Sequence, residues 1–352
     1  MDPLRVLLVS ETFAARPGGI ERHADLLREK LEGNAAEVVQ VRWAEKSRSV
    51  WESANWVVVE GVNRLQMLRR RLSPGPKHQI QVLFTHGSFY ELIHRRQLFR
   101  QGFTTNPIVH LSKLFFDWMF VHWICTSYDL VVTLSDEETA ELVLYLGLPR
   151  SRFLASGNLW PENQTPRGVA PQSNLVDGAR PMVLCVGRVE KRKNFRAAAE
   201  SVRGLPLDLV IAGRSSDDSR ALERYIRKHE LTNVYLVGEV SEDERLTLLG
   251  RARAIVIPSF IEGIPYIGLE GILAGKHVIC TENCYADSIP GFTLVPPKAS
   301  AIRAALLALP GEARLPLIRS KELNQETMDS FLFVVRECMA SRNHIETGGL
   351  YS

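Results

Sequence analysis

Two acidic residues, Glu262 and Glu270, lie eight positions apart in an apolar, glycine-dotted stretch. An isolated carboxylate is costly to bury there, so we expect each to have a partner. A strand-like run at 254–259 and Pro265, which suits the first turn of a helix, predict a strand–loop–helix unit around them. Glu270 then leans back toward the loop that holds Glu262. Two interpretations follow. The helix dipole favours both carboxylates, which gives them a structural role. A carboxylate can also accept hydrogen bonds from the two hydroxyls of a ribose, which gives Glu270 a ligand-binding role.

A cluster of cations follows the first strand of the second half of the chain. Four of them, from Arg188 to Lys193, come after a predicted strand ending at Gly187 and before a helix expected to begin near Asn194. Cations at the carboxyl end of a strand and beside a helix N-terminus neutralise a diphosphate. A solvated basic turn is the alternative interpretation.

A second phosphate-binding candidate is the pair Gly18 and Gly19, which precedes an amphipathic helix after the first predicted strand. Backbone N–H groups at such a position can approach a phosphate, although Gly-Gly is also common in plain turns. The chain contains no G-x-G-x-x-G, so the usual dinucleotide fingerprint is absent.

Short apolar, β-branched runs alternate with amphipathic stretches along both halves of the chain, a pattern typical of parallel sheets covered on both faces. The predicted strands are 4–10, 38–43, 56–60, 81–86 and 130–135 in the first half, and 182–187, 207–213, 233–238, 254–259, 277–280 and 292–297 in the second. Predicted helices include 194–203, 219–229, 242–251, which begins with a Ser241/Glu244 capping box, and 320–339. Two doubly wound, Rossmann-like α/β domains are therefore expected.

The domain boundaries follow from a proline-, glycine- and polar-rich stretch at 161–181, which we interpret as an interdomain linker. It separates an N-terminal, acceptor-side domain (1–160) from a C-terminal domain (182–318). A helix and tail (319–352) follow, and we expect the helix to pack back on the N-terminal domain. Parallel sheets bind ligands at the carboxyl ends of their strands, so two such domains are expected to face each other across a cleft suited to a two-part substrate.

Composition is that of a soluble globular protein, with 45% hydrophobic and 24% charged residues, and a net charge of +3 is too small to indicate nucleic acid. Residues 61–115 hold nine Lys or Arg against one acidic residue, which fits either a solvated surface or contact with an anionic membrane or acceptor. The aromatic run 108–124 carries too many polar groups for a membrane span, so it is either a core helix or a helix that dips into a membrane surface. The five cysteines have no pairing or zinc-like spacing and suit free thiols in a reducing compartment. With no signal peptide visible, a cytoplasmic protein, membrane-associated at the inner face, is expected.

With these features the chain resembles the retaining glycosyltransferases of family 4, which have the GT-B fold. The resemblance runs from the GGIERH loop to about Pro297, and its most specific element is the E-x7-E motif formed by Glu262 and Glu270. Three further elements are GR-x4-KN with Arg188 and Lys193, the pair Gly18-Gly19, and THG with His86.

The resemblance implies transfer of a hexose, with retention of anomeric configuration, from a UDP- or GDP-linked donor. Glu270 would hold the ribose, and Glu262 would face the sugar, either as a nucleophile or only to position it. Arg188, Lys193 and the N–H groups of Gly18 and Gly19 would stabilise the diphosphate. Three residues would complete the donor-binding loop: Gly263, Ile264 and Pro265. His86 would approach the sugar from the N-terminal domain.

No cofactor is implied, and the chain has no D-x-D, so no metal ligands are assigned. The implied acceptor is a glycan, a lipid-linked molecule or a small molecule, in cell-envelope or surface polysaccharide biosynthesis.

Two departures from the family pattern leave the donor open. After Asn158 the family usually shows a glycine, a hydrophobic residue and an aspartate, whereas this chain has Leu159 and Trp160. After the predicted strand 277–280 the usual glycine pair is replaced by Cys284-Tyr285, and Asp287 stands where glutamate is common. A nucleotide-sugar 2-epimerase of the same fold and a non-catalytic nucleotide-sugar-binding protein both remain as alternatives.

Overall fold

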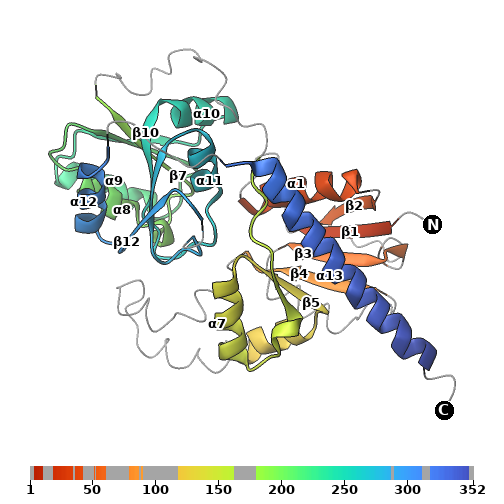
Figure 1. Cartoon of the computed structure of the whole chain (residues 1–352). Coiled ribbons are helices and arrows are strands. Elements are labelled where there is room, and N and C mark those ends of the chain that lie inside the picture. The colour runs from red at the N-terminus through yellow and green to blue at the C-terminus, as the bar shows by residue number, and fades with distance from the viewer. Residues whose placement is uncertain are drawn as a thin grey trace. The chain divides into compact units, whose positions relative to one another are not determined.

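The computed structural model (Figure 1) describes most of the chain in two compact units. The described residues are 4–10, 19–34, 36–42, 51, 53–60, 79–86, 89, 118–161, 180–286, 289–310 and 318–348. Of these, unit 1 contains the residues up to Trp160 and those from Lys321 onward, and unit 2 contains those from Pro161 to Ser320. Each unit is described by itself below.

Unit 1 contains one six-stranded sheet of order β2-β1-β3-β4-β5-β6, in which every pairing is parallel. Its strands are β1 (Leu4–Ser10), β2 (Ala36–Arg42), β3 (Trp56–Glu60), β4 (Ile80–Phe84), β5 (Leu130–Thr133) and β6 (Phe153–Ala155). The central strand β3 is buried along its whole length, because helices cover both faces of the sheet. That burial explains its uninterrupted apolar run.

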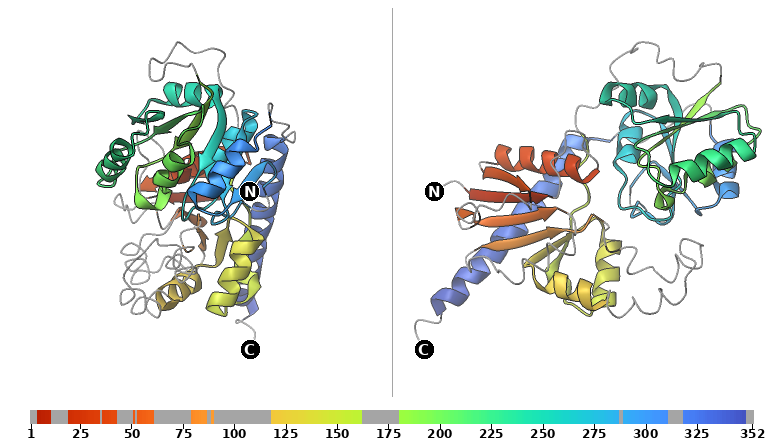
Figure 2. Two further views of the ribbon diagram at one scale, coloured as in Figure 1. Left: turned by 90° about the vertical axis from the view of Figure 1, so that its left-hand side faces the viewer. Right: turned by 180° about the vertical axis from the view of Figure 1, so that it is seen from behind.

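Helices cover both faces of this sheet. On one face α1 (Gly19–Gly33) and α13 (Ser320–Gly348) share a core cluster with β1, in which Leu27 and Phe331 are fully buried. Figure 2 shows α13 lying along the sheet. On the other face, α7 (Asp136–Leu146) and the helical residues 118–126 form a second cluster. The C-terminal helix thus packs back on the N-terminal half, as expected.

Unit 2 also contains a six-stranded parallel sheet, of order β12-β11-β10-β7-β8-β9. Its strands are β7 (Met182–Val186), β8 (Asp208–Ala212), β9 (Val234–Gly238), β10 (Ala252–Ile257), β11 (His277–Thr281) and β12 (Phe292–Val295). The helices of one face are α8 (Phe195–Ser201), α9 (Ser219–Lys228) and α12 (Ala299–Leu307), and those of the other are α10 (Glu242–Arg251) and α11 (Tyr266–Leu273). The loop between β7 and α8 contains a short 3-10 helix, η2 (Lys191–Lys193).

The prediction of two Rossmann-like α/β units is confirmed, and the departures are local. Strand β6 was not predicted, because three residues after a short 3-10 turn carry too little periodicity. The C-terminal helix runs to Gly348, past the predicted end at 339. Residues 162–179 of the predicted linker lie outside the described residues. The described end of the aromatic run 108–124 is a core helix, with Val121 and Ile124 fully buried.

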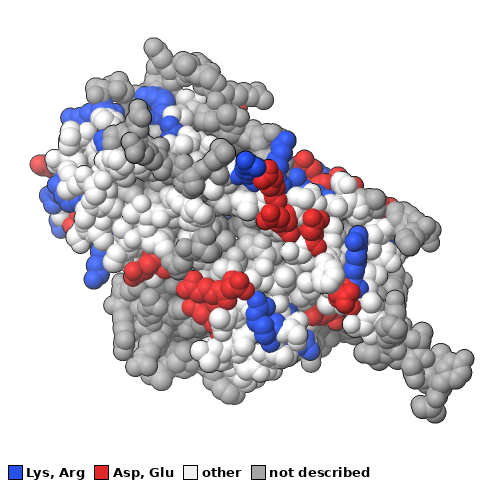
Figure 3. Space-filling view, in the orientation of Figure 1, with Lys and Arg blue, Asp and Glu red and all other residues white. Residues whose placement is uncertain are grey.

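Both signs of charge occur on the surface of the described residues. Figure 3 shows groups of basic and groups of acidic side chains on one face. Asp136 and Arg150 form a surface ion pair at 2.8 Å. The basic segment 61–115 lies outside the described residues apart from 79–86 and 89. Among the helices that are described, none is both long and apolar enough to cross a membrane.

Candidate functional site

The carboxyl ends of β7 and β8 come so close in unit 2 that only glycine fits between them. A Cβ on Gly213, whose φ is +150°, would lie 2.1 Å from the backbone oxygen of Gly187. Gly187 has a φ of +147°, and a Cβ there would lie 3.3 Å from Cε of Lys193. The two glycines therefore let the strands meet and leave room for the Lys193 side chain to lie over the end of β7.

Glu262 is held in the loop after β10 by two cations and a hydroxyl. Lys193 pairs with Oε2 through Nζ, Arg192 donates from Nη1 to Oε1 at 3.3 Å, and Ser259 donates from Oγ to Oε2 at 3.0 Å. Burial raises the pKa of the Glu262 carboxyl, but the charges of Lys193 and Arg192 and these hydrogen bonds lower it overall to about 2. Glu262 is therefore a carboxylate throughout the physiological range.

Arg192 connects the basic turn to the loop of Glu262. Besides Glu262, its guanidinium donates to Glu190 Oε1 at 2.7 Å and to the carbonyl oxygen of Ile261 at 3.2 Å, and its own carbonyl accepts from Phe260 N–H at 2.8 Å. Two of the four cations of the basic turn, Arg192 and Lys193, are thus engaged with Glu262, and the other two are exposed. The Arg188 side chain is 64% exposed and lies 4.0 Å from Glu190.

Glu270 is 1% exposed and forms an ion pair with Arg245 of α10. Arg245 donates to both of its oxygens, through Nη1 to Oε2 and through Nη2 to Oε1 at 3.2 Å, and also donates to Glu242. Burial lowers the pKa of Arg245, but the hydrogen bonds and charges of Glu242 and Glu270 outweigh it, so the pKa is raised overall. Arg245 was not identified from the sequence, because nothing local links position 245 to position 270.

Helix α11 fixes the position of Glu270 by packing tightly on the sheet. Pro265 is its N-cap residue, and Ile264 before it is buried. A Cβ on Gly268 would lie 2.5 Å from Phe292, and one on Gly271 would lie 2.9 Å from Ile255. The glycines on this helix are therefore explained by close contact with β10 and β12 rather than by contact with a ligand.

The loop after β11, where the sequence departs from the family pattern, packs against the loop of Glu262. Asn283 donates from Nδ2 to the carbonyl oxygen of Phe260 at 2.9 Å, and Glu262 N–H donates to the carbonyl oxygen of Asn283 at 3.3 Å. Cys284 and Tyr285 are buried. Cys284 also forms an isolated parallel bridge with Glu262, whereas Asp287 lies outside the described residues.

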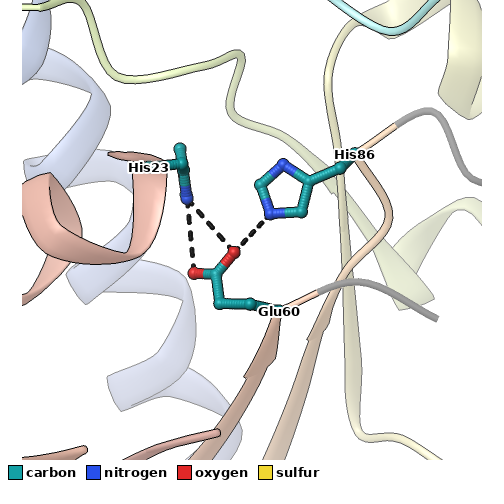
Figure 4. A group of neighbouring side chains, drawn as sticks. All are labelled: His23, Glu60 and His86. Atoms are coloured by element: carbon teal, nitrogen blue, oxygen red, sulfur yellow. Dashed lines mark hydrogen bonds and ion pairs between the residues drawn. The ribbon is translucent and has the colours of Figure 1, made fainter. Parts of the chain in front are cut away.

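The candidate residues of unit 1 lie at the carboxyl edge of its own sheet. Gly19 is the first residue of α1, and Gly18 lies outside the described residues. His86 follows β4 with a φ of 48° and donates from Nε2 to the Glu60 carboxylate. The second histidine on Glu60 is His23, whose Nδ1 lies 3.3 and 3.2 Å from the two carboxylate oxygens (Figure 4).

Burial and the mutual charges of the three side chains act against each other in this group. Burial lowers the pKa of His23, while the charge of Glu60 and the hydrogen bond to it act in the opposite direction. Burial raises the pKa of Glu60, but the two imidazoles outweigh it and hold that pKa at about 2. Sequence reasoning identified His86 alone, and the only available signal for Glu60 was an acidic residue at the end of an otherwise apolar strand.

The structure therefore brings Glu262 and Lys193 into direct contact and adds Arg192 and Ser259 to them. It places Glu270 in a separate ion pair with Arg245.

Comparison with known proteins relates part of this chain to a protein family. Residues 167–305 match the family model described as Glycosyl transferases group 1, so this part of the chain carries a glycosyltransferase group 1 domain. The uncharacterized glycosyltransferase MJ1178 of Methanocaldococcus jannaschii is 24% identical over 98 residues, which are 28% of this chain and 28% of that protein.

Solved structures that resemble this chain have two-domain folds of the same kind. Sucrose-phosphate synthase from Thermosynechococcus elongatus has a TM-score of 0.70 at 16% identity, with 98% of this chain and 100% of that chain covered. Anabaena Alr3699/HepE in complex with UDP and glucose has a TM-score of 0.62 at 10% identity, with 99% of each chain covered. The lipopolysaccharide outer core galactosyltransferase WaaB has a TM-score of 0.59 at 14% identity, with 95% and 99% covered. The two parallel-sheet units of this chain have the GT-B fold.

Proposed function

We propose that this chain is a retaining glycosyltransferase of family 4 that moves a hexose from a UDP- or GDP-linked donor without a metal ion in the transfer step. The observation that carries the proposal is the contact of Glu262, from the E-x7-E motif, with Lys193 of the predicted diphosphate-binding pair, inside a glycosyltransferase group 1 domain. Arg192, which the motif did not include, contacts Glu262 as well. The UDP-glucose complex of the Anabaena neighbour supports a nucleotide-sugar donor.

The donor diphosphate is assigned to the turn after β7. Arg188 is exposed there, and Lys193 offers three N–H donors, of which one is directed at Glu262. As the bond between the anomeric carbon and the diphosphate breaks, negative charge grows on the diphosphate. Because of that extra charge, fixed cations stabilise the transition state more than they stabilise the ground state. The acceptor hydroxyl forms the new bond to the same carbon and gives its proton to the departing phosphate oxygen.

Glu262 is assigned a positioning and electrostatic role. Its pKa of about 2 makes the carboxylate a weak base, and two cations and a hydroxyl already occupy its oxygens. Such a group can hold sugar hydroxyls and favour the positive charge of an oxocarbenium-like transition state, but it is a poor covalent nucleophile.

Glu270 is assigned to the ribose hydroxyls, with Arg245 fixing the direction of its carboxylate. Gly263 and Ile264, just before α11, would place backbone N–H groups near the donor, and Pro265, which has no N–H, would shape the loop as the N-cap residue of α11. The assignments of Gly18, Gly19 and His86 to the donor stay predictions. So do a glycan, lipid-linked or small-molecule acceptor, a pathway of cell-envelope or surface polysaccharide synthesis, and membrane contact through residues 61–115.

A screen of UDP- and GDP-hexoses by thermal shift, followed by transfer assays with the nucleotide sugars that stabilise the protein, tests this proposal. We expect one nucleotide class to raise the Tm and the product to keep the anomeric configuration of the donor, as read by proton NMR. An inverted product, or no stabilisation by any nucleotide sugar, would refute it. Co-sedimentation with anionic vesicles at low salt tests the membrane contact separately.

A further inference from the structure

The most distinctive buried polar group in unit 1 is formed by His23, Glu60 and His86. Each residue comes from a different place: the first turns of α1, the last position of β3, and the turn after β4 (Figure 4). The side chains are 1%, 0% and 6% exposed respectively. Neither histidine points its ligating nitrogen away from the carboxylate, so three metal-binding functions converge on one point.

We propose that His23 Nδ1, the Glu60 carboxylate and His86 Nε2 bind a divalent transition-metal ion of the Zn²⁺ class. Their ligand atoms all lie within 4.8 Å of one another. In a tetrahedral site with bonds of about 2.1 Å, ligand atoms lie about 3.4 Å apart, and His23 Nδ1 lies 3.2 and 3.3 Å from the Glu60 oxygens. His86 Nε2 is in direct hydrogen-bond contact with Glu60, so this ring has to move away from the carboxylate for an ion to enter.

The chemistry of the donor set supports this assignment. Two imidazoles and one carboxylate are a set that proteins use for zinc and for other borderline divalent metals, with further positions left for water or a ligand. Softer sites use thiolates, and magnesium sites use oxygen ligands alone. The group thus favours zinc-like ions over magnesium.

The surroundings hold the group in a fixed shape. β3 and β4 are adjacent strands, with Glu60 paired in register with Phe84. The Phe84 ring lies 6.0 Å from that of His86, stacked, and 5.0 Å from that of His23, so an apolar wall supports both imidazoles. His86 adopts a φ of 48°, which non-glycine residues seldom do and which turns its ring toward Glu60.

Charge gives a second, independent argument. Among the residues that the structure describes, the ion-pair partners of Glu60 are the two histidines, and no Lys or Arg neutralises it. The two imidazoles already stabilise the buried Glu60 carboxylate, and a divalent ion between the three side chains would add a full counter-charge. The alternative is a carboxylate that only accepts N–H bonds from the two rings and binds no ion.

The spacing explains why the sequence pointed to no metal. Glu60 lies 37 residues from His23 and 26 residues from His86. No linear motif spans such separations, and only the pairing of β3 with β4 and the position of α1 bring the three together.

Metal analysis of the full-length chain tests the proposal. After treatment with a chelator and dialysis against Zn²⁺, we expect about one equivalent of zinc per chain by mass spectrometry. Co²⁺ should give the visible absorption of a tetrahedral or five-coordinate site, and Mg²⁺ should not compete. His23→Gln and Glu60→Gln should each weaken zinc binding at least about tenfold, whereas His229→Gln in unit 2 serves as the matched control.

Circular dichroism of each variant verifies that it is folded before binding is measured. Zinc uptake far below one equivalent, or uptake equal in the wild type and in folded His23→Gln and Glu60→Gln, would overturn the proposal and leave a hydrogen-bonded carboxylate. The readout is metal binding and not glycosyl transfer, so failure of this proposal leaves the proposed retaining transfer untouched. Zinc bound by His86 Nε2 would exclude the donor-sugar contact predicted for that residue.

Discussion

Replacing Arg245 with methionine tests whether Glu270 is buried in the way the structure shows. The change removes the cation that touches both oxygens of a side chain that is 1% exposed. Losing one member of a buried pair costs about 3–5 kcal/mol, because the other charge stays without compensation. The variant can also avoid the buried charge by protonating the carboxyl, which for an ordinary carboxyl costs about 3–4 kcal/mol at pH 7. This cost is the upper limit of the destabilisation. We therefore expect unit 2 to lose about 3 kcal/mol.

The same reasoning predicts a pH dependence. At pH 5 protonation of an ordinary carboxyl costs only about 1 kcal/mol, so the penalty of Arg245→Met should shrink to about that value. The double variant Arg245→Met/Glu270→Gln carries no buried charge at this position and should recover most of the loss at pH 7.

The assay must report on unit 2 alone. All six tryptophans precede residue 161, so tryptophan fluorescence follows unit 1. Hydrogen exchange measured by mass spectrometry on peptides of α10 and α11 reports the opening free energy of unit 2 directly. A loss below about 1 kcal/mol, a loss that does not change between pH 7 and pH 5, or a double variant no more stable than Arg245→Met would refute the reasoning.

Three further predictions concern single contacts. Burial raises the pKa of Glu138 to about 7, so the native state binds the proton more tightly than the unfolded state. The free energy of unfolding of the wild-type unit 1, compared with that of the Glu138→Gln variant, should therefore fall by up to about 3 kcal/mol as the pH rises from 5 to 7.5. Urea unfolding followed by tryptophan fluorescence measures both. Lys193→Met should lower kcat of transfer by at least about a hundredfold with a smaller change in KM, because the cation acts mainly on charge that develops in the transition state. Gly213→Ala should destabilise unit 2 by about 2–4 kcal/mol in hydrogen exchange, since its Cβ would overlap the backbone oxygen of Gly187.

Each of these has a matched control or a contrary outcome. If the wild type became more stable relative to Glu138→Gln as the pH rises, the predicted direction would be contradicted. Lys191→Met changes a neighbouring cation outside the Glu262 contact and should leave kcat close to the wild-type value. Gly204→Ala, with a φ of +68° and open space around its Cβ, should cost only about 1 kcal/mol, and an equal cost at Gly213 would argue against the overlap.

Much of the fold could be predicted, because it depends on local patterns. The Ser241 and Glu244 capping box was predicted from four residues and is present, with the Ser241 N–H donating to Glu244 at 2.7 Å. The alternation of apolar strands and amphipathic helices likewise determines the parallel sheets. Strand β6 could not be predicted, since three residues hold no period.

The contacts of the candidate site depended on tertiary structure. The sequence placed Glu262 in a loop after a strand and Lys193 before a helix, but their contact spans 69 residues. Arg245 reaches Glu270 because α10 and α11 cover the same face of one sheet, which no local pattern encodes. The same holds for the side chains around Glu60.

Isothermal titration of UDP and of GDP into the wild type and the Arg188→Ala/Lys193→Ala variant tests the central claim, that unit 2 binds a nucleoside diphosphate at the turn after β7. We predict that one of the two nucleotides binds the wild type with one-to-one stoichiometry and that the double variant, still folded, binds it at least about a hundredfold more weakly. Equal affinity in the two proteins, or no binding of either nucleotide to the wild type at millimolar concentration, would contradict the account.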